Sequence, residues 1–190
     1  LKKEFPEGHV IFVTAHLGNW ELLSRFLSRE IESPVLSIYK PHSRPRLNEF
    51  LRFLRHDGMQ RTVEKEGALV AFVRHLRKKG CVGMLVDQHA DAVGVPSVFL
   101  GRACRSWDFA VRLAHSTGCP LVPVSCVRED GRFRILWTEA LVLPQDGQGR
   151  WDTLAATRAV DDALSSMVAQ FPQQWLWAGR RWGRHFDSPG

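Results

Sequence analysis

The sequence has no long apolar run, and this absence excludes a membrane-spanning helix within it. The longest uninterrupted stretch of hydrophobic residues is Ala68–Val73, whereas a transmembrane helix needs about 20 apolar residues. Cysteine is sparse: Cys81, Cys104, Cys119 and Cys126 occur without a Cys-x-x-Cys pair and at irregular spacing. This pattern favours reduced, mostly buried thiols over a disulfide framework or a zinc site, so we expect a reducing compartment.

Several signatures of other function classes are also missing. There is no Gly-x-Ser-x-Gly elbow and no cysteine between a strand and a helix, so a covalent serine or cysteine mechanism lacks its nucleophile. The net charge of +6 and the seven tryptophans would suit nucleic-acid binding. However, no helix-turn-helix, zinc-finger or RNP-like motif is present, and we expect no nucleic-acid partner.

The chain is long enough, at 190 residues with 44% hydrophobic, to form the core of one domain. It contains no repeat, linker or second core, which predicts a single domain over residues 1–190. Because the sequence begins with Leu1 rather than Met, we expect it to be a portion of a longer polypeptide.

Hydrophobic patterning predicts alternating strands and helices. Apolar residues at helical spacing form stripes that start at Leu47, Leu69 and Trp107, and Glu129–Gly131 has the composition of a hairpin turn. The expected strands are Val10–Thr14, Val35–Ile38, Val82–Val86, Leu121–Val127 and Phe133–Trp137, followed by a long helix over Asp152–Gln170. This order predicts an α/β fold in which helices flank both faces of a mixed sheet.

The stretch richest in chemistry is Val10–Glu21, where a hydrophobic strand ends at His16. Gly18 permits a turn, and Asn19 is a good N-cap for the helix that we expect to follow. Glu21 then falls in the first helical turn, where the helix dipole favours a carboxylate. We expect Glu21 to hold one ring nitrogen of His16, which leaves the other free to take a proton from a hydroxyl.

Plainer explanations stay open at this point, because a His-x4-Glu pair alone is a weak signal. His16 could satisfy a backbone carbonyl at the strand end while Glu21 is solvated. Asp87, His89 and Asp91 could share a face and bind a metal, but such groups equally line a substrate cleft at the end of a strand. We expect no metal there, and we expect Asp87 to orient an arginine.

Six blocks in chain order carry a resemblance to a known family. They are Ala15-His16-Leu17-Gly18-Asn19-Trp20-Glu21-Leu22, Tyr39-Lys40-Pro41, Gly83-Met84-Leu85-Val86-Asp87-Gln88, Phe99-Leu100-Gly101-Arg102, Gly118-Cys119-Pro120-Leu121-Val122-Pro123-Val124 and Phe171-Pro172-Gln173-Gln174-Trp175-Leu176-Trp177. These blocks resemble the signatures of the lipid A biosynthesis acyltransferases, the late lauroyl- or myristoyl-transferring family of the His-x4-Asp/Glu acyltransferase superfamily. Their order and spacing argue against coincidence.

The resemblance implies an O-acyltransferase of the glycerolipid-acyltransferase fold. It would move a fatty acyl chain from an acyl carrier protein or CoA thioester to a hydroxyl of a membrane glycolipid, a lipid A precursor. It implies that His16 is the base and Glu21 its acidic partner, with no metal or cofactor. It further implies a membrane-associated segment before the domain and a location at the cytoplasmic face of the bacterial inner membrane, peripheral or anchored through that segment.

Six residues are candidates for binding substrate: Asn19, Lys40, Arg44, Arg55, Asp87 and Arg102. The arginine cluster between positions 44 and 61 could bind phosphates of an acidic lipid or steer an acidic carrier protein, although a solvated basic face is the ordinary explanation. Arg102 could stabilise the thioester oxygen or form only a surface salt bridge. Lys40 stands where the family usually has arginine, and a lysine lacks the bidentate fork. This difference bears on the identity of the acceptor rather than on the type of reaction.

Two alternatives to the lipid A interpretation remain. The acceptor could be a lysophospholipid or another glycolipid, which the sequence does not distinguish. The domain could also have lost catalysis and act as a module that binds lipid or carrier protein, but the intact His16 and Glu21 count against this.

Overall fold

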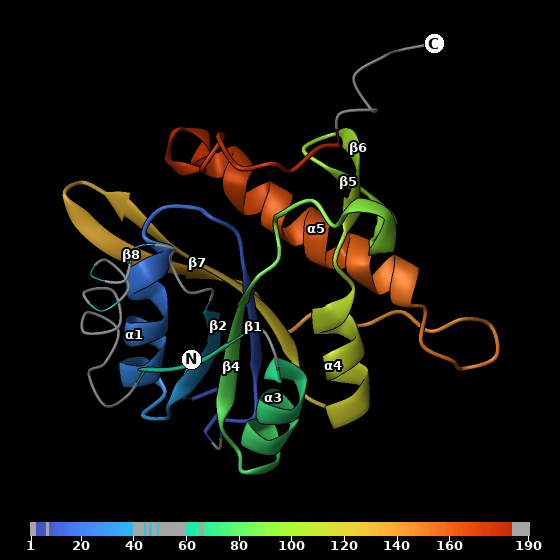
Figure 1. Ribbon diagram of the computed structural model, residues 1–190, viewed down its shortest axis with the longest axis horizontal. Helices are drawn as coiled ribbons and strands as arrows, with labels where there is room; N and C mark the ends of the chain where they lie inside the picture. Colours follow the sequence, from blue (N-terminus) through green and yellow to red (C-terminus); the bar gives the residue numbers. More distant parts are fainter. Residues whose placement is uncertain are drawn as a thin grey trace.

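The computed structural model describes residues 3–6, 8–39, 44, 46, 49, 60–64 and 67–183. A six-stranded sheet forms the centre of this part of the chain, in the order β3-β2-β4-β1-β7-β8 (Figure 1). Its strands are β1 (Ile11–Thr14), β2 (Val35–Tyr39), β3 (Gln60–Glu64), β4 (Cys81–Leu85), β7 (Leu121–Glu129) and β8 (Arg132–Trp137).

Five of these strands run parallel, and β8 alone is antiparallel to its neighbour. The antiparallel pair is closed by the two-residue turn Asp130-Gly131, whose φ angles are 50° and 76°. Positive φ at both turn positions matches the right-handed twist of the two strands in a tight hairpin. The dipeptide Asp-Gly adopts these φ angles readily. The hairpin predicted from Glu129–Gly131 is therefore confirmed, and the sheet is mixed as expected.

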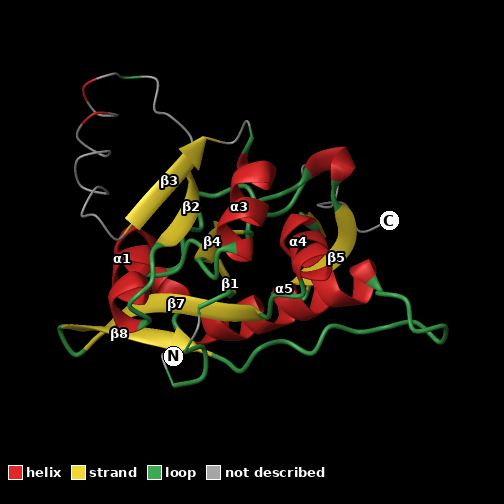
Figure 2. Ribbon diagram, turned by 90° about the horizontal axis from the view of Figure 1, so that it is seen from below, coloured by secondary structure: helices red, strands yellow, loops and turns green. Residues whose placement is uncertain are grey.

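Helices cover both faces of the sheet (Figures 1 and 2). They are α1 (Trp20–Glu30), α3 (Ala68–Arg77), α4 (Phe109–Thr117) and α5 (Thr153–Gln170), with short 3₁₀ turns η1 (Asp91–Val93) and η2 (Pro172–Gln174). On one face α1 packs with Val10 and Phe12, and on the other α3, α4 and α5 pack with Ile11 and Val13. Alternate residues of β1 thus enter two cores, as expected for a strand buried on both sides. The α/β fold class is confirmed.

A second, two-stranded sheet was not predicted. β5 (Val95–Phe99) and β6 (Arg102–Ser106) form a hairpin beside α5 (Figure 1). Its turn is Leu100-Gly101, with φ angles of 49° and 77°. The left-handed Leu100 is held in place because its N–H donates to Ser165 Oγ at 3.1 Å. Leucine is not a typical residue of such turns, so no hairpin signal is present in the sequence here.

The edge strand β3 was not predicted either, whereas the other strands of the central sheet and the described helices agree with the sequence. The helix expected on the Leu47 stripe lies outside the described residues. All four cysteines are free and buried, as predicted from their spacing. None of the described helices combines the length and the apolar character needed to cross a bilayer.

Candidate active site

The candidate site lies at the carboxyl ends of two neighbouring parallel strands. β1 pairs with β4 in a register that places Thr14 opposite Leu85, and Val86 N–H donates to the Thr14 carbonyl at 3.0 Å. Continued for two residues, this register sets His16 opposite Asp87. Open α/β sheets commonly bind their ligands at this edge.

The two side chains form a close pair. His16 Nδ1 lies 2.7 Å from Asp87 Oδ1, and the His16 backbone N–H donates to Asp87 Oδ2 at 2.8 Å. The histidine side chain is 15% exposed and the aspartate 3%. Because an ionised carboxylate only accepts hydrogen bonds, the proton of a neutral imidazole is held at Nδ1 and Nε2 keeps its lone pair. The arrangement is therefore suited to accept a proton at Nε2.

Asp87 receives a third hydrogen bond from the C-terminal part of the chain. The indole Nε1–H of Trp175 donates to Asp87 Oδ2 at 2.9 Å. Burial raises the pKa of Asp87, but the hydrogen bonds and charge of His16 and the bond from Trp175 outweigh it and hold the pKa below its ordinary 3.8. Asp87 is therefore ionised at neutral pH.

The loop that carries His16 is fixed by Gly18 and Asn19. Gly18 has a φ of 63°, and a Cβ there would lie 2.1 Å from the Cys126 carbonyl oxygen. Asn19 Oδ1 accepts from Leu22 N–H at 3.1 Å and so caps α1, as predicted. The Asn19 side chain, also predicted to bind substrate, is thus engaged in holding the first turn of the helix.

Glu21 does not hold the Nδ1 atom of His16, since that atom is bonded to Asp87. Glu21 lies in the first turn of α1, as expected, and is exposed. The orienting contact that the sequence assigned to Glu21 is therefore made by Asp87. The expectation that Asp87 orients an arginine was wrong, because its carboxylate is instead bound by His16 and Trp175.

Of the other predicted substrate-binding residues, Arg44 and Arg102 lie within the described part of the chain. Arg102 begins β6 and is exposed, and its guanidinium lies 5.1 Å from the ring centroid of Trp182. Arg44 is exposed, whereas Lys40 and Arg55 lie outside the described residues.

The acidic residues after β4 point to different partners. Asp87 faces His16, while Asp91 forms an ion pair with Arg180 and lies 3.8 Å from His89 Nε2. Among the residues that the structure describes, no group of three His, Cys, Asp or Glu side chains could hold a metal ion.

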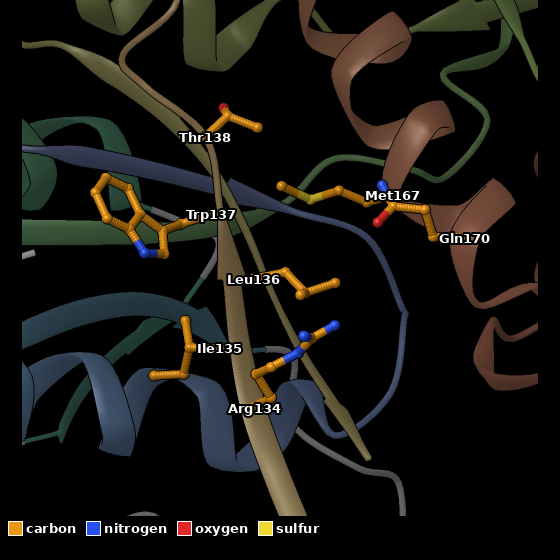
Figure 3. Close-up of a pocket in the computed structure, with 7 residues that line it drawn as sticks. All are labelled: Arg134, Ile135, Leu136, Trp137, Thr138, Met167 and Gln170. Atoms are coloured by element: carbon orange, nitrogen blue, oxygen red, sulfur yellow. The ribbon is translucent and has the colours of Figure 1, made fainter. Parts of the chain in front are cut away.

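A separate hollow of about 280 Å³ lies between β8 and the end of α5. Met167 and Gln170 reach it from α5, and the other lining residues come from β8 and the residue after it (Figure 3). These are Arg134, Ile135, Leu136, Trp137 and Thr138. The lining includes none of the predicted site residues.

Sequence reasoning missed the partnership of His16, Asp87 and Trp175. A signal for Asp87 was present, because it follows the buried strand of β4 just as His16 follows that of β1. Trp175 belongs to one of the six blocks, but nothing in a single sequence indicates that its indole reaches Asp87.

Comparison with known proteins identifies the family. The family described as bacterial lipid A biosynthesis acyltransferase matches residues 2–184. No curated protein matches the chain. The family match covers nearly the whole chain and includes β1, β4 and the segment around Trp175, which meet at His16 and Asp87. The chain therefore belongs to the bacterial lipid A biosynthesis acyltransferase family.

Proposed function

We propose that the protein transfers a fatty acyl chain from a thioester to a lipid hydroxyl, with His16 as general base and Asp87 as the residue that orients it. Membership of the family makes it an acyltransferase. The observation that supports the proposed roles is the 2.7 Å contact between His16 Nδ1 and a buried, ionised carboxylate. This contact leaves Nε2 as the basic atom of a partly exposed ring.

The reaction that fits this geometry is direct transfer. Nε2 of His16 takes the proton of the acceptor hydroxyl as its oxygen attacks the thioester carbonyl carbon. The tetrahedral intermediate then collapses, the carbon–sulfur bond breaks, and the leaving thiolate receives the proton from the imidazolium. Asp87 stabilises that imidazolium while it carries the proton, as the acid of a catalytic triad does.

The finer substrate assignments are part of the same proposal. The donor is an acyl carrier protein thioester, because the net charge of +6 favours an acidic protein partner. The acceptor is a phosphorylated glycolipid of the lipid A type, which the family description and the exposed Arg44, Arg46 and Arg61 support. If acyl-CoA supported transfer and acyl carrier protein thioesters did not, the assignment of the donor would be contradicted.

Glu21 and Arg102 are assigned to the substrates in this proposal. Glu21 is exposed in the turn that follows His16, so its carboxylate is placed to bind the acceptor. Arg102 is exposed on β6, and its guanidinium would bind phosphate or the thioester oxygen. A Glu21→Gln enzyme with an unchanged KM for the acceptor, or an Arg102→Gln enzyme with unchanged kinetics, would contradict these roles.

We place the protein at the cytoplasmic face of the bacterial inner membrane, because its lipid acceptor must be reached from a compartment that supplies carrier-protein thioesters. Anionic lipid attracts a basic protein by about 1 kcal/mol for each cationic side chain near the surface. Co-flotation of the full-length protein with anionic vesicles would support this, and failure to float with them at low salt would contradict it.

The decisive experiment follows the acyl chain itself. The full-length protein is incubated with mixed acyl-carrier and acyl-CoA thioesters and a membrane lipid extract, and mass spectrometry identifies the lipid that gains a chain. Replacing His16 with Ala removes the base, so transfer should fall by about 10²–10⁴-fold. Circular dichroism checks that the variant is folded. Near-normal turnover by a folded His16→Ala protein would falsify the assignment.

A further inference from the structure

We propose that Trp175 is a positioning residue of the active site, whose indole N–H fixes Asp87 against His16. The inference rests on the proposed function, in which His16 is the base. Trp175 does not contact substrate in this account. It acts through Asp87, because it donates to Oδ2 while Oδ1 faces His16.

The indole contact is specific and buried. Asp87 Oδ2 accepts from both the His16 backbone at 2.8 Å and Trp175 Nε1 at 2.9 Å, so its partner Oδ1 is aimed at His16 Nδ1. Trp175 is the most buried of the seven tryptophans, at 5% exposure. A buried indole N–H needs an acceptor, and here the acceptor is the carboxylate that orients the base.

Neighbouring rings hold the indole at this angle. The ring centroid of Trp175 lies 5.5 Å from that of Phe99, 4.7 Å from that of Trp177 and 5.7 Å from that of Trp182. The last two contacts are edge-to-face, a favourable arrangement for aromatic pairs. The indole therefore has little freedom to turn away from Asp87.

The backbone on either side of Trp175 is tied to the loop of His16. Leu176 N–H donates to the His16 carbonyl, and Gly18 N–H donates to the Gln174 carbonyl, both at 2.9 Å. The Gln174 side chain in turn bonds the Arg128 N–H and carbonyl on β7, each at 2.8 Å. The segment 174–176 is thus a strap that fixes the backbone of His16 and the carboxylate of Asp87 together.

Removing the indole N–H should change two measurable properties. The loss of one hydrogen bond to a charged acceptor corresponds to about a tenfold loss in kcat/KM. With one donor fewer, the Asp87 carboxylate attracts the protonated imidazole more strongly, so the acidic limb of the pH profile moves to higher pH. A tryptophan that only fills space would not move that limb.

The test compares Trp175→Phe with Trp177→Phe. Both changes replace an indole by a phenyl ring, which keeps an aromatic side chain at positions 175 and 177 and removes one indole donor. Trp177, however, donates to the Pro172 carbonyl rather than to Asp87. We expect the acidic limb of kcat/KM to move to higher pH in Trp175→Phe and to stay in place in Trp177→Phe. An unmoved limb in a folded Trp175→Phe enzyme overturns the proposal.

A second measurement decides the matter if Trp175→Phe fails to fold. The indole N–H resonance of Trp175 is compared between the unmodified protein and Asp87→Asn by ¹H–¹⁵N NMR. In Asp87→Asn we expect the resonance to move upfield and the indole proton to exchange faster with solvent. An identical resonance in the two proteins would overturn the proposal. A fully active His16→Ala protein would instead overturn the proposed function, and this NMR comparison does not depend on that result.

Discussion

At the residue scale, the site depends on a carboxylate that is buried yet ionised. Asp87 accepts three hydrogen bonds, two from His16 and one from Trp175, and these offset the cost of burying its charge. The residue types at the site were visible in the sequence, and His16 was found from its place after a strand. Its partner was assigned to Glu21 because sequence proximity favoured it, whereas the pairing of β1 with β4 brings Asp87 closer.

Gly18 is the residue whose replacement should most disturb this loop. The methyl group of Gly18→Ala would overlap with the Cys126 carbonyl oxygen, and the alanine would have to adopt a φ of 63°. We expect the free energy of unfolding to fall by about 2–4 kcal/mol, from the strained φ and the steric overlap together.

Gly149→Ala is the matched control for Gly18→Ala. Gly149 has a similar φ of 74°, but nothing lies within 4 Å of the position that a Cβ would take. Only the conformational strain applies, so we expect a loss of about 1 kcal/mol in urea unfolding. Equal losses in the two variants would show that close approach to Cys126 does not matter.

At the element scale, a buried ion pair joins the C-terminal segment after Trp175 to the β5–β6 hairpin and α5. Arg181 and Asp161 are each 1% exposed, and Arg181 Nη2 lies 2.7 Å from both Asp161 Oδ1 and Ser106 Oγ. The guanidinium also lies 4.6 Å from the ring centroid of Phe99. The hairpin and this pair were not predicted, because nothing in the spacing of Asp161 and Arg181 indicates their contact and the Leu100-Gly101 turn begins with leucine, which is not a typical turn residue.

Removing Arg181 should therefore be costly. Arg181→Met leaves the carboxylate of Asp161 buried without its cation, and we expect a loss of about 3–5 kcal/mol in the free energy of unfolding. The adjacent Arg180→Met removes only an exposed ion pair with Asp91, for which we expect less than about 1 kcal/mol. Urea denaturation followed by tryptophan fluorescence measures both, and similar values for the two variants would contradict this account.

At the scale of the whole molecule, periodicity predicted the fold class but not the order of the strands. Runs such as Val10–Thr14 and Leu121–Val127 identify strands buried on both faces, and alternation with helices indicates a largely parallel sheet. When a helix connects two parallel strands, the sequence does not reveal whether these strands are neighbours in the sheet. The adjacency of β1 and β4 could therefore not be derived from spacing, and the His16–Asp87 pair followed only from the structure.

The most direct test of the central claim is the pH dependence of kcat/KM in the unmodified enzyme, Asp87→Asn and Glu21→Gln. Asp87 is ionised because its pKa lies below 3.8, and its charge favours the imidazolium of His16. Removing that charge should lower kcat/KM by at least about 10²-fold and move the acidic limb to lower pH. Glu21→Gln should leave that limb unchanged. A limb that moves in Glu21→Gln and stays in place in Asp87→Asn would contradict the account.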